Sequence, residues 1–479
     1  MAPSTLVVIA AVSGLALSAG LNAREFPGAT VGRGFVSIPV SGQRRDSSNM
    51  LRKRADGFAN VNINNLKTSG YTIEISVGTP PQALTVAVDT GSSELWVNPD
   101  CSKASRASNK TINGQIYITV DDTLSDPEQC RKRGEYDQSK SSSAKKATFN
   151  GQELKDNIIQ YGDMTTVETA YVEDKFSIAG LQFDNQIFGV AKQSNGTGIG
   201  IMGFGPSAYG FENNVTYPLI LTNMAKQKVI NSPAFSLDLR DYDNSTGSLI
   251  FGGVDKKKYA GSLAKIPFKK LLTKYSTGEP FNSTSYYLTV KSMSLTLPNN
   301  SNKNIDAAPK DGFLVSLDCG AGDNVLPKGI ATQICSGIGA ETVPDSDNSC
   351  KIDCSYRSKP GGLKVSLEGK DIMVPWENLI NEQEFASGNV CYVMVSDNMK
   401  FEAGILGAPF LRSVYAVFDW GNENLHIAQS ADCGSHIVAI GSGVDAVPGG
   451  NGECSLAAST VARFGLAVGT ALLTGLALL

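Results

Sequence analysis

The chain has 479 residues, of which 41% are hydrophobic and 18% are charged, and its formal net charge at pH 7 is -4. This length allows two sizeable domains, and the composition excludes a disordered chain and one that is embedded in a membrane throughout. The slight negative charge argues against a nucleic-acid binder. The two histidines, His426 and His436, argue against a histidine-based triad or a zinc site, so acid–base chemistry is expected from carboxylates.

The N-terminus has the pattern of a secretory signal peptide. The first 23 residues carry no charged side chain, and the apolar run 6–17 is followed by small residues. This pattern predicts a signal peptide over residues 1–20, with cleavage between Ala19 and Ala23.

Residues 21–54 form a basic segment. They hold seven basic residues against two acidic ones and end in Leu51-Arg52-Lys53-Arg54, where a protease specific for basic pairs could cut. A disordered basic tail is the alternative. We favour a removable propeptide, because a basic segment would bind the more acidic remainder of the chain at neutral pH and loosen as carboxylates protonate.

Beyond residue 55 the sequence predicts β-structure almost throughout. Short runs rich in Val, Ile, Thr and Tyr, such as 71–77, 286–297 and 363–367, alternate with Gly, Asn, Asp and Pro turns. Short helices are expected only near 217–226 and 329–337. Predicted N-glycosylation sites, which agree with passage through the secretory pathway, are Asn109, Asn195, Asn214, Asn244, Asn282 and Asn299.

The nine cysteines also suggest an oxidising compartment. Cys101 and Cys130 bracket a polar loop, and Cys354 and Cys391 bracket a strand-rich piece, so we predict these two disulfides. Zinc binding through the Cys350-X3-Cys354 spacing is a competing interpretation, but no matching pair or histidine stands at a suitable distance. The sequence leaves open the pairing of Cys335, Cys350, Cys433 and Cys454.

Residues 439–479 are predicted to be a linker and an attachment signal. Residues 447–452 are small and polar, a spacer follows, and the run 464–479 is apolar to the last residue. This is the pattern of a signal for glycosylphosphatidylinositol (GPI) attachment, which we place between Gly449 and Ser455. A single-pass anchor is the alternative, although such an anchor is usually longer and has a basic stop.

Two Asp-X-Gly turns carry the predicted chemistry. The alternating apolar run 86–88 leads into Asp89-Thr90-Gly91, and the glycine permits a sharp turn and a close approach to the carboxylate. Alone, this motif could be a surface turn. However, the run 314–317 leads into Asp318-Cys319-Gly320 in the same way, which indicates one site built from two related halves.

With these motifs the chain resembles the pepsin-like aspartic endopeptidases, and most closely the GPI-anchored, yapsin-like members found in fungi. The resemblance extends from about Tyr71 to Ala428. It rests on several motifs in order, namely 77–82, 89–93 with Trp96, 161–163, 247–255, 318–320 leading to 326–327, 405–412 with Tyr415, and 417–419.

The resemblance implies an all-β, bilobal fold with a cleft between two pseudo-twofold lobes, 55–255 and 256–438. Asp89 and Asp318 would share a proton and titrate as a pair. The ionised member would activate a water for attack on the scissile carbonyl, and the protonated member would polarise that carbonyl. The resemblance also implies peptide or protein substrates, an acidic working pH, a monomer, and neither cofactor nor metal.

Further site residues follow from the same resemblance. Tyr161 matches the tyrosine of a flap that closes over substrate, and its hydroxyl would reach the indole of Trp96; an exposed hairpin aromatic is the alternative. Asp163 would face a basic substrate side chain or would simply form a turn. Residues expected to leave room for substrate are Gly91, Gly162 and Gly320. Residues expected to support the two aspartates are Thr90, Ser92, Trp96 and Cys319.

Three positions depart from the family pattern. Cys319 and Ala321 stand where Ser or Thr is usual, and Met164 stands where the flap commonly has Gly. A thiol is a weaker donor than a hydroxyl, so the brace between the lobes is softened. The hydroxyl missing at Ala321 costs about 1.5–3 kcal/mol of support for a charged Asp318 and should raise its proton affinity.

Two functions therefore remain open. One is a secreted, cell-surface endopeptidase with an altered pH optimum. The other is a weak or inactive pseudoprotease that binds peptides or organises the cell wall. We favour the endopeptidase because both Asp89 and Asp318 are present.

Overall fold

The computed structural model describes the backbone of residues 30–32, 35–37, 59–65, 70–99, 101, 110–112, 115–117, 127–162, 165–195, 198–206, 217–241, 246–274, 280–343, 350–385, 388–397 and 403–455, and the side chains of most of them. The predicted signal peptide lies outside the described residues, as does the propeptide apart from β1 (Thr30–Gly32) and β2 (Phe35–Ser37). Within these ranges, no helix is long and apolar enough to cross a membrane.

Strands dominate the described chain, as the sequence predicts. Those up to residue 255 are β3 (Ala59–Asn65), β4 (Tyr71–Val77), β5 (Gln82–Asp89), β6 (Leu95–Val97), β7 (Lys110–Ile112), β8 (Gln115–Tyr117), β9 (Lys145–Lys146), β10 (Thr148–Phe149), β11 (Gln152–Glu153), β12 (Asn157–Gln160), β13 (Thr166–Ile178), β14 (Leu181–Asn195), β15 (Gly200–Gly203), β16 (Ala234–Asp238), β17 (Thr246–Phe251) and β18 (Gly253–Asp255).

The later strands are β19 (Tyr259–Pro267), β20 (Lys269–Lys274), β21 (Pro280–Thr296), β22 (Asn302–Asn304), β23 (Phe313–Leu317), β24 (Asn324–Val325), β25 (Glu341–Thr342), β26 (Cys350–Ile352), β27 (Gly362–Leu367), β28 (Lys370–Pro375), β29 (Ile380–Phe385), β30 (Gly388–Val393), β31 (Val395–Ser396), β32 (Gly404–Leu406), β33 (Val414–Asp419), β34 (Asn424–Ser430) and β35 (Ile437–Ala439).

The helices are short. They are α1 (Pro127–Lys132), α2 (Ile220–Lys226), α3 (Ile330–Gly337), α4 (Trp376–Leu379) and α5 (Ala408–Leu411). The expected helices correspond to α2 and α3, whereas α1, α4 and α5 are too short for a 3.6-residue period to reveal them.

Two large sheets repeat one local arrangement. In the 14-stranded sheet, β15 lies between β5 and β6 and runs parallel to β5, which sets Gly203 opposite Asp89. In the nine-stranded sheet, β32 lies between β23 and β24 and runs parallel to β23, which sets Leu406 opposite Leu317. In each sheet the strand that delivers an Asp turn is therefore fixed by a later strand that begins with glycine.

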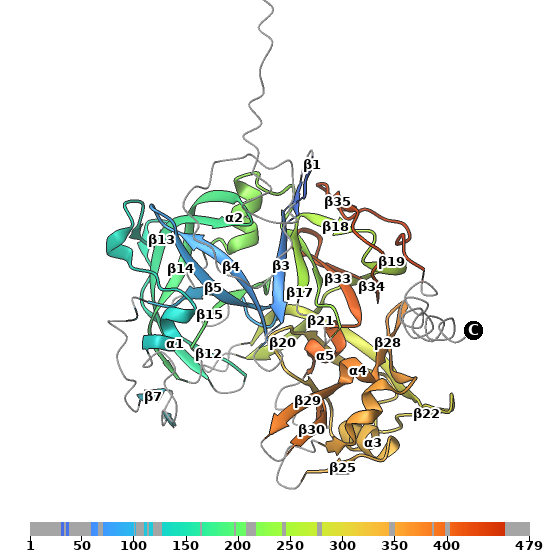
Figure 1. Ribbon diagram of the computed structural model, residues 1–479. Coiled ribbons are helices and arrows are strands. Elements are labelled where there is room, and N and C mark those ends of the chain that lie inside the picture. Colours follow the sequence, from blue (N-terminus) through green and yellow to red (C-terminus); the bar gives the residue numbers. More distant parts are fainter. Residues whose placement is uncertain are drawn as a thin grey trace, which may run out of the picture.

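A shared set of strands joins the two halves. Figure 1 shows β4, β5 and β13–β15 in one part of the molecule, β25, β29, β30 and α3 in another, and β3, β17 and β33 between them. Here β16 pairs with β17 on one side and β33 on the other. The boundary predicted between residues 255 and 256 stays a prediction, since strands from both sides of it share this sheet.

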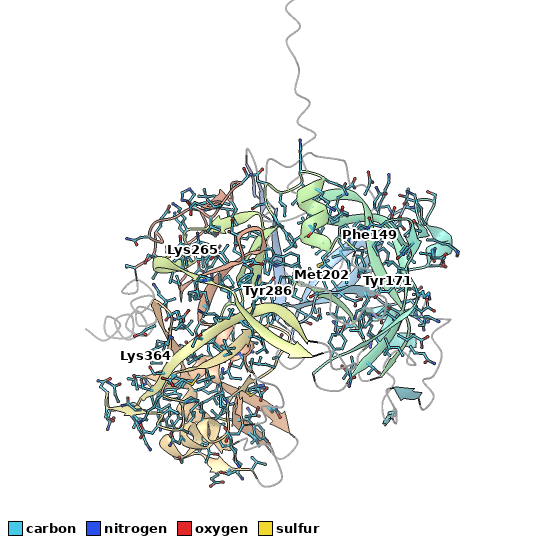
Figure 2. The ribbon with its side chains drawn as sticks, turned by 180° about the vertical axis from the view of Figure 1, so that it is seen from behind. Phe149, Tyr171, Met202, Lys265, Tyr286 and Lys364 are labelled. Atoms are coloured by element: carbon cyan, nitrogen blue, oxygen red, sulfur yellow. A yellow bond between two sulfur atoms is a disulfide. The ribbon has the colours of Figure 1, made fainter. Side chains whose placement is uncertain are left out.

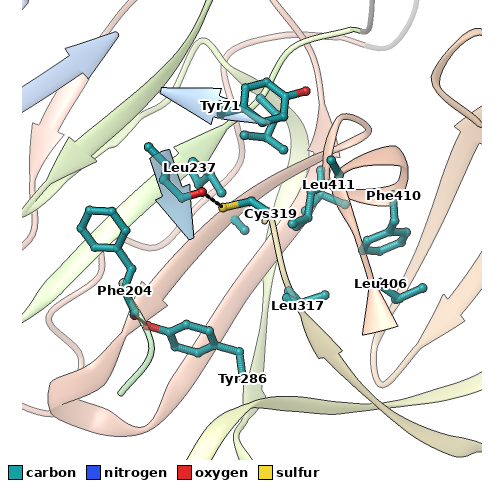
Figure 3. Close-up of a cluster of buried hydrophobic side chains, with 14 of the residues drawn as sticks. Tyr71, Phe204, Leu237, Tyr286, Leu317, Cys319, Leu406, Phe410 and Leu411 are labelled. Carbon is teal, nitrogen blue, oxygen red and sulfur yellow. Dashed lines mark hydrogen bonds between the residues drawn. The ribbon is translucent and has the colours of Figure 1, made fainter. Parts of the chain in front are cut away.

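An aromatic core fills the junction between the halves. The rings of Phe235 and Phe418 stack with centroids 4.6 Å apart, and Tyr286 packs edge-on against Phe418 at 4.5 Å. The buried hydroxyl of Tyr286 donates to the carbonyl oxygen of Phe204 (Figure 3). It also accepts from the indole of Trp420. Its polar tip is thus satisfied within an apolar cluster, which fixes its orientation.

All nine cysteines lie among the described residues, and eight of them form four disulfides. Both predicted pairs, Cys101–Cys130 and Cys354–Cys391, are formed. The remaining bonds, which the sequence left open, are Cys335–Cys350 and Cys433–Cys454. Cys319 is free and buried.

Residues 439–455 differ from the expected linker. Ile440 is fully buried, and Ala446 and Val447 pack with it against Tyr259 and Tyr415. The segment is therefore part of the folded body, because its few apolar residues pack on an apolar surface of that body. In the sequence these residues stand among small and polar ones, which is why the segment resembles a linker.

Candidate active site

Asp89 is the last residue of β5 and is held by two donors. Alternate residues of β5 are buried, so the strand is fixed against the core and carries Asp89 to its end. Asp89 as a whole residue is 8% exposed. Its Oδ1 accepts the N–H of Gly91 at 2.8 Å, and its Oδ2 accepts the hydroxyl of Ser92. Both bonds fix the orientation of the Asp89 carboxyl group.

Asp318 follows β23 and is held by backbone groups. Its Oδ1 accepts the N–H of Gly320 at 2.8 Å and that of Ala321 at 3.2 Å. Because Ala321 has no hydroxyl, the side-chain donor that Ser92 gives Asp89 has no counterpart at this position. In both turns a glycine N–H therefore donates to the carboxylate, but only the turn of Asp89 adds a side-chain donor.

The two carboxyl groups lie side by side because each turn has a glycine where the other's carboxyl approaches. A Cβ added to Gly91 would lie 2.3 Å from Oδ2 of Asp318. One added to Gly320 would lie 2.7 Å from Oδ1 of Asp89. Any larger residue at either position would push the carboxyls apart. Gly91 and Gly320 are thus essential to the pair, while their predicted contact with substrate stays a prediction.

The surroundings of Asp318 raise its pKa. Burial is the largest cause that raises the pKa of Asp318 well above its usual range, followed by the charge of Asp89 and a hydrogen bond to it. The N–H groups of Gly320 and Ala321 lower this pKa and are outweighed. The expected direction is therefore found, but burial and Asp89, rather than the missing hydroxyl, are its main causes.

Reciprocal hydrogen bonds join the two turns. The hydroxyl of Thr90 donates to the carbonyl of Leu317 at 3.0 Å and accepts the N–H of Cys319 at 2.9 Å. In return, Sγ of Cys319 donates to the carbonyl of Val88 at 3.4 Å (Figure 3). The brace expected between the lobes is thus present, with a hydroxyl on one side and a weaker thiol on the other.

The expected flap is a hairpin of β12 and β13. Tyr161, near its tip, is half-buried, and its hydroxyl accepts the N–H of the buried Trp96 indole at 2.7 Å. The expected contact between these two residues is therefore present. Gly162 is exposed at the tip, where it leaves space open. Asp163 and Met164 lie outside the described residues, so their predicted roles stay predictions.

A buried carboxyl group next to the first strand of the flap was not predicted from the sequence. Glu94, only 3% exposed, accepts hydrogen bonds from the Tyr171 hydroxyl and, at 3.4 Å, from the amide of Asn157, the first residue of β12. Burial is the main cause that raises the pKa of Glu94 to about 7. Figure 2 shows Tyr171 in the part of the molecule that contains β13 and β14, away from Lys265 and Lys364. The one feature of the sequence that points to this buried carboxyl is the position of Glu94 directly before the apolar run 95–97.

Other predicted sites are only partly described. Asn299 is exposed in a turn. Asn195 and Asn282 lie in β14 and β21, with side chains outside the description. Asn109, Asn214 and Asn244 are outside the described residues. Among the described residues, one possible metal-ligating group consists of Cys354, Glu382 and Cys391, but its cysteines are joined in a disulfide and offer no thiolate.

Comparison with known proteins places this geometry in context. A family model described as eukaryotic aspartyl protease matches residues 70–430. The probable aspartic-type endopeptidase opsB of Aspergillus fumigatus is 29% identical, over 89% of this chain and 82% of that protein. Aspartic proteinase yapsin-3 of Saccharomyces cerevisiae is 27% identical, over 83% of this chain and 73% of that protein.

Two further matches agree with these. Candidapepsin of Candida tropicalis is 31% identical, over 79% of this chain and 83% of that protein. The crystal structure of the aspartic proteinase from Irpex lacteus superposes with a TM-score of 0.58 at 18% identity, and the match covers 78% of this chain and 98% of that chain. This last match concerns the fold, which is the bilobal fold that the sequence predicts.

Proposed function

This chain belongs to the eukaryotic aspartyl protease family and is by that membership an aspartic-type endopeptidase, and we propose that it hydrolyses peptide bonds with a water activated between Asp89 and Asp318 at acidic pH. The observation that carries this proposal is that the two carboxyl groups lie close together, because each one approaches the glycine of the other's turn. Two adjacent carboxyls share a proton, so one pair supplies a base and an acid at once.

The unequal support of the two aspartates assigns their roles. Asp89, held by Gly91 and Ser92, is the ionised member and takes a proton from the attacking water. Asp318, whose pKa is raised, keeps its proton and donates to the oxygen of the scissile carbonyl. Attack gives a tetrahedral diol, and proton transfer from the pair to the amide nitrogen then breaks the C–N bond.

The substitutions at the second turn are compatible with hydrolysis. Loss of a hydroxyl donor at Ala321 favours the neutral form of Asp318, which is the form that its role as an acid requires. Cys319 still donates to Val88, so the brace between the turns is retained. For these reasons we do not favour the pseudoprotease.

The proposed setting is the cell surface. Four disulfides support passage through an oxidising compartment. The signal-peptide pattern, the basic propeptide and the C-terminal signal support a secreted precursor that is processed and GPI-anchored, and that acts as a monomer on peptide or protein substrates. The raised pKa of Glu94 supports an acidic working range, because its neutral form is the one that burial favours.

One assay tests this function. The purified protein without its propeptide would be incubated with a peptide library between about pH 3 and 7, with and without a pepstatin-type transition-state mimic, beside an Asp89→Asn variant. We expect acid-dependent cleavage that both the mimic and the substitution abolish. Binding of the mimic without any cleavage by the unchanged protein would instead support the pseudoprotease.

A further inference from the structure

The segment that precedes the predicted attachment signal is built into the fold. Strand β35 pairs antiparallel with β18. The carboxylate of Asp255, at the end of β18, accepts the hydroxyl of Ser435 at 2.6 Å and the N–H of His436 at 2.7 Å. The chain beyond β34 is therefore tied to the body both by its backbone and by a buried carboxylate.

These contacts continue almost to the end of the described chain. The N–H of Gly452 donates to the carbonyl of Gly261 at 2.8 Å, and that of Glu453 donates to the carbonyl of Lys256 at 2.7 Å. A Cβ added to Gly452 would lie 2.1 Å from the carbonyl oxygen of Tyr259, so the segment lies directly on β19. Residues 451–453 are thus held by specific backbone contacts.

A disulfide closes the segment. Cys454 is 7% exposed and is bonded to Cys433, 21 residues earlier. It also forms an isolated parallel bridge with Ala260. The next residue, Ser455, is exposed. Cys454 is therefore part of the folded body, and Ser455 directly after it is exposed.

GPI attachment removes everything that follows the attachment residue. In this exchange the peptide bond after that residue breaks, its carbonyl forms an amide with the ethanolamine amine of the glycolipid, and the released peptide retains the nitrogen and gains a hydrogen. Attachment anywhere from Gly449 to Glu453 would remove Cys454 and leave Cys433 unpaired. Attachment before Gly452 would also remove the backbone contacts that residues 452 and 453 make with Gly261 and Lys256.

We propose that the glycolipid is attached to Ser455, directly after the last disulfide; this inference rests on the proposed GPI anchoring. Cys454 is buried and bonded, whereas Ser455 is small and exposed. Residues 456–463 then form the spacer, which matches the usual length of about 8–12 residues, and the apolar run 464–479 forms the tail. Ala457 provides a second small residue two positions after the attachment residue.

The test uses the full chain, expressed in eukaryotic cells that attach GPI. Protein released by phosphatidylinositol-specific phospholipase C is digested without reduction and analysed by mass spectrometry. We expect a C-terminal peptide that ends at Ser455, carries the ethanolamine-phosphate remnant and is linked through Cys454 to the peptide of Cys433. A remnant on any other residue would overturn this assignment while upholding GPI anchoring. Absence of both release and remnant would overturn the proposed anchoring itself.

A pair of variants gives a second readout. Gly449→Gln is the matched control, because a Cβ at Gly449 meets nothing within 4 Å and its backbone is not left-handed. We expect Ser455→Gln to lower the lipase-released protein several-fold or to move the remnant, and Gly449→Gln to change neither. The opposite pattern would place the attachment residue before the disulfide and refute the proposal.

Discussion

Sγ of Cys319 donates a hydrogen bond to the carbonyl oxygen of Val88 at 3.4 Å, which ties the turn of Asp318 to the strand that delivers Asp89. A hydroxyl is a stronger donor than this thiol. We therefore expect Cys319→Ser to stabilise the protein by about 0.5–1 kcal/mol, and Cys319→Ala to destabilise it because the carbonyl of Val88 loses its donor. Urea unfolding measures both, and a Cys319→Ser variant no more stable than Cys319→Ala would contradict the brace.

Ala321→Thr should shift the pH dependence of catalysis. The added hydroxyl would support the charged form of Asp318 and lower its pKa. Because Asp318 must be protonated to act as the acid, we expect the basic limb of the kcat/KM profile to move to lower pH by about one unit, from a hydrogen bond of about 1.5 kcal/mol. Ala321→Val, similar in volume without the donor, is the control, and an equal shift in both variants would refute the cause.

Glu94→Gln should remove a pH-dependent loss of stability. Burial raises the pKa of Glu94 from 4.5 to about 7. Between these values the folded protein binds more protons than the unfolded chain, so stability falls as pH rises through this window and the loss is complete above about pH 7. The loss is about 3 kcal/mol.

The melting temperatures of the two proteins should therefore diverge with pH. We expect Glu94→Gln to melt close to the unchanged protein at pH 4, and clearly higher at pH 7.5, because the amide can still accept from Tyr171 without a charge. A constant difference across this range would show that Glu94 does not titrate there. Tyr171, whose hydroxyl contacts Glu94, stays neutral because burial raises its pKa.

Gly91→Ala should lower kcat by about 10²-fold while the fold is kept. The new methyl would lie 2.3 Å from Oδ2 of Asp318 and displace that carboxyl. A misplacement of about 1 Å lowers kcat by about 10²-fold. Gly322→Ala is the matched control, since a Cβ there meets nothing within 4 Å. Equal activity in the two variants would refute the close approach of the carboxyls.

The sequence predicts those parts of the site that depend on local pattern. The alternation in β5 and the Asp-X-Gly turns are local, so the sequence alone predicts both aspartates and their glycines. Glu94 was not found, because its burial depends on Asn157 and Tyr171, 63 and 77 residues away. Nothing near Glu94 in the chain reveals those partners.

The same reason explains the missed features of the C-terminal segment. The pairing of Cys433 with Cys454 depends on how β35 pairs with β18, which is more than 170 residues earlier in the chain. Small residues such as Gly452 are typical of a linker, yet here their smallness permits direct contact with the body. Composition alone does not separate these two uses of glycine.

The shared sheet has a consequence for synthesis. Asp238 in β16 pairs with Tyr415 in β33, and Tyr71 accepts a hydrogen bond from Arg412, 341 residues later. The outer edge of β16 therefore has no partner until the ribosome has made nearly the whole body. During that interval an open strand edge can pair with other chains. We therefore expect that truncation before residue 414 leaves this edge open and yields an aggregating fragment rather than an independent lobe.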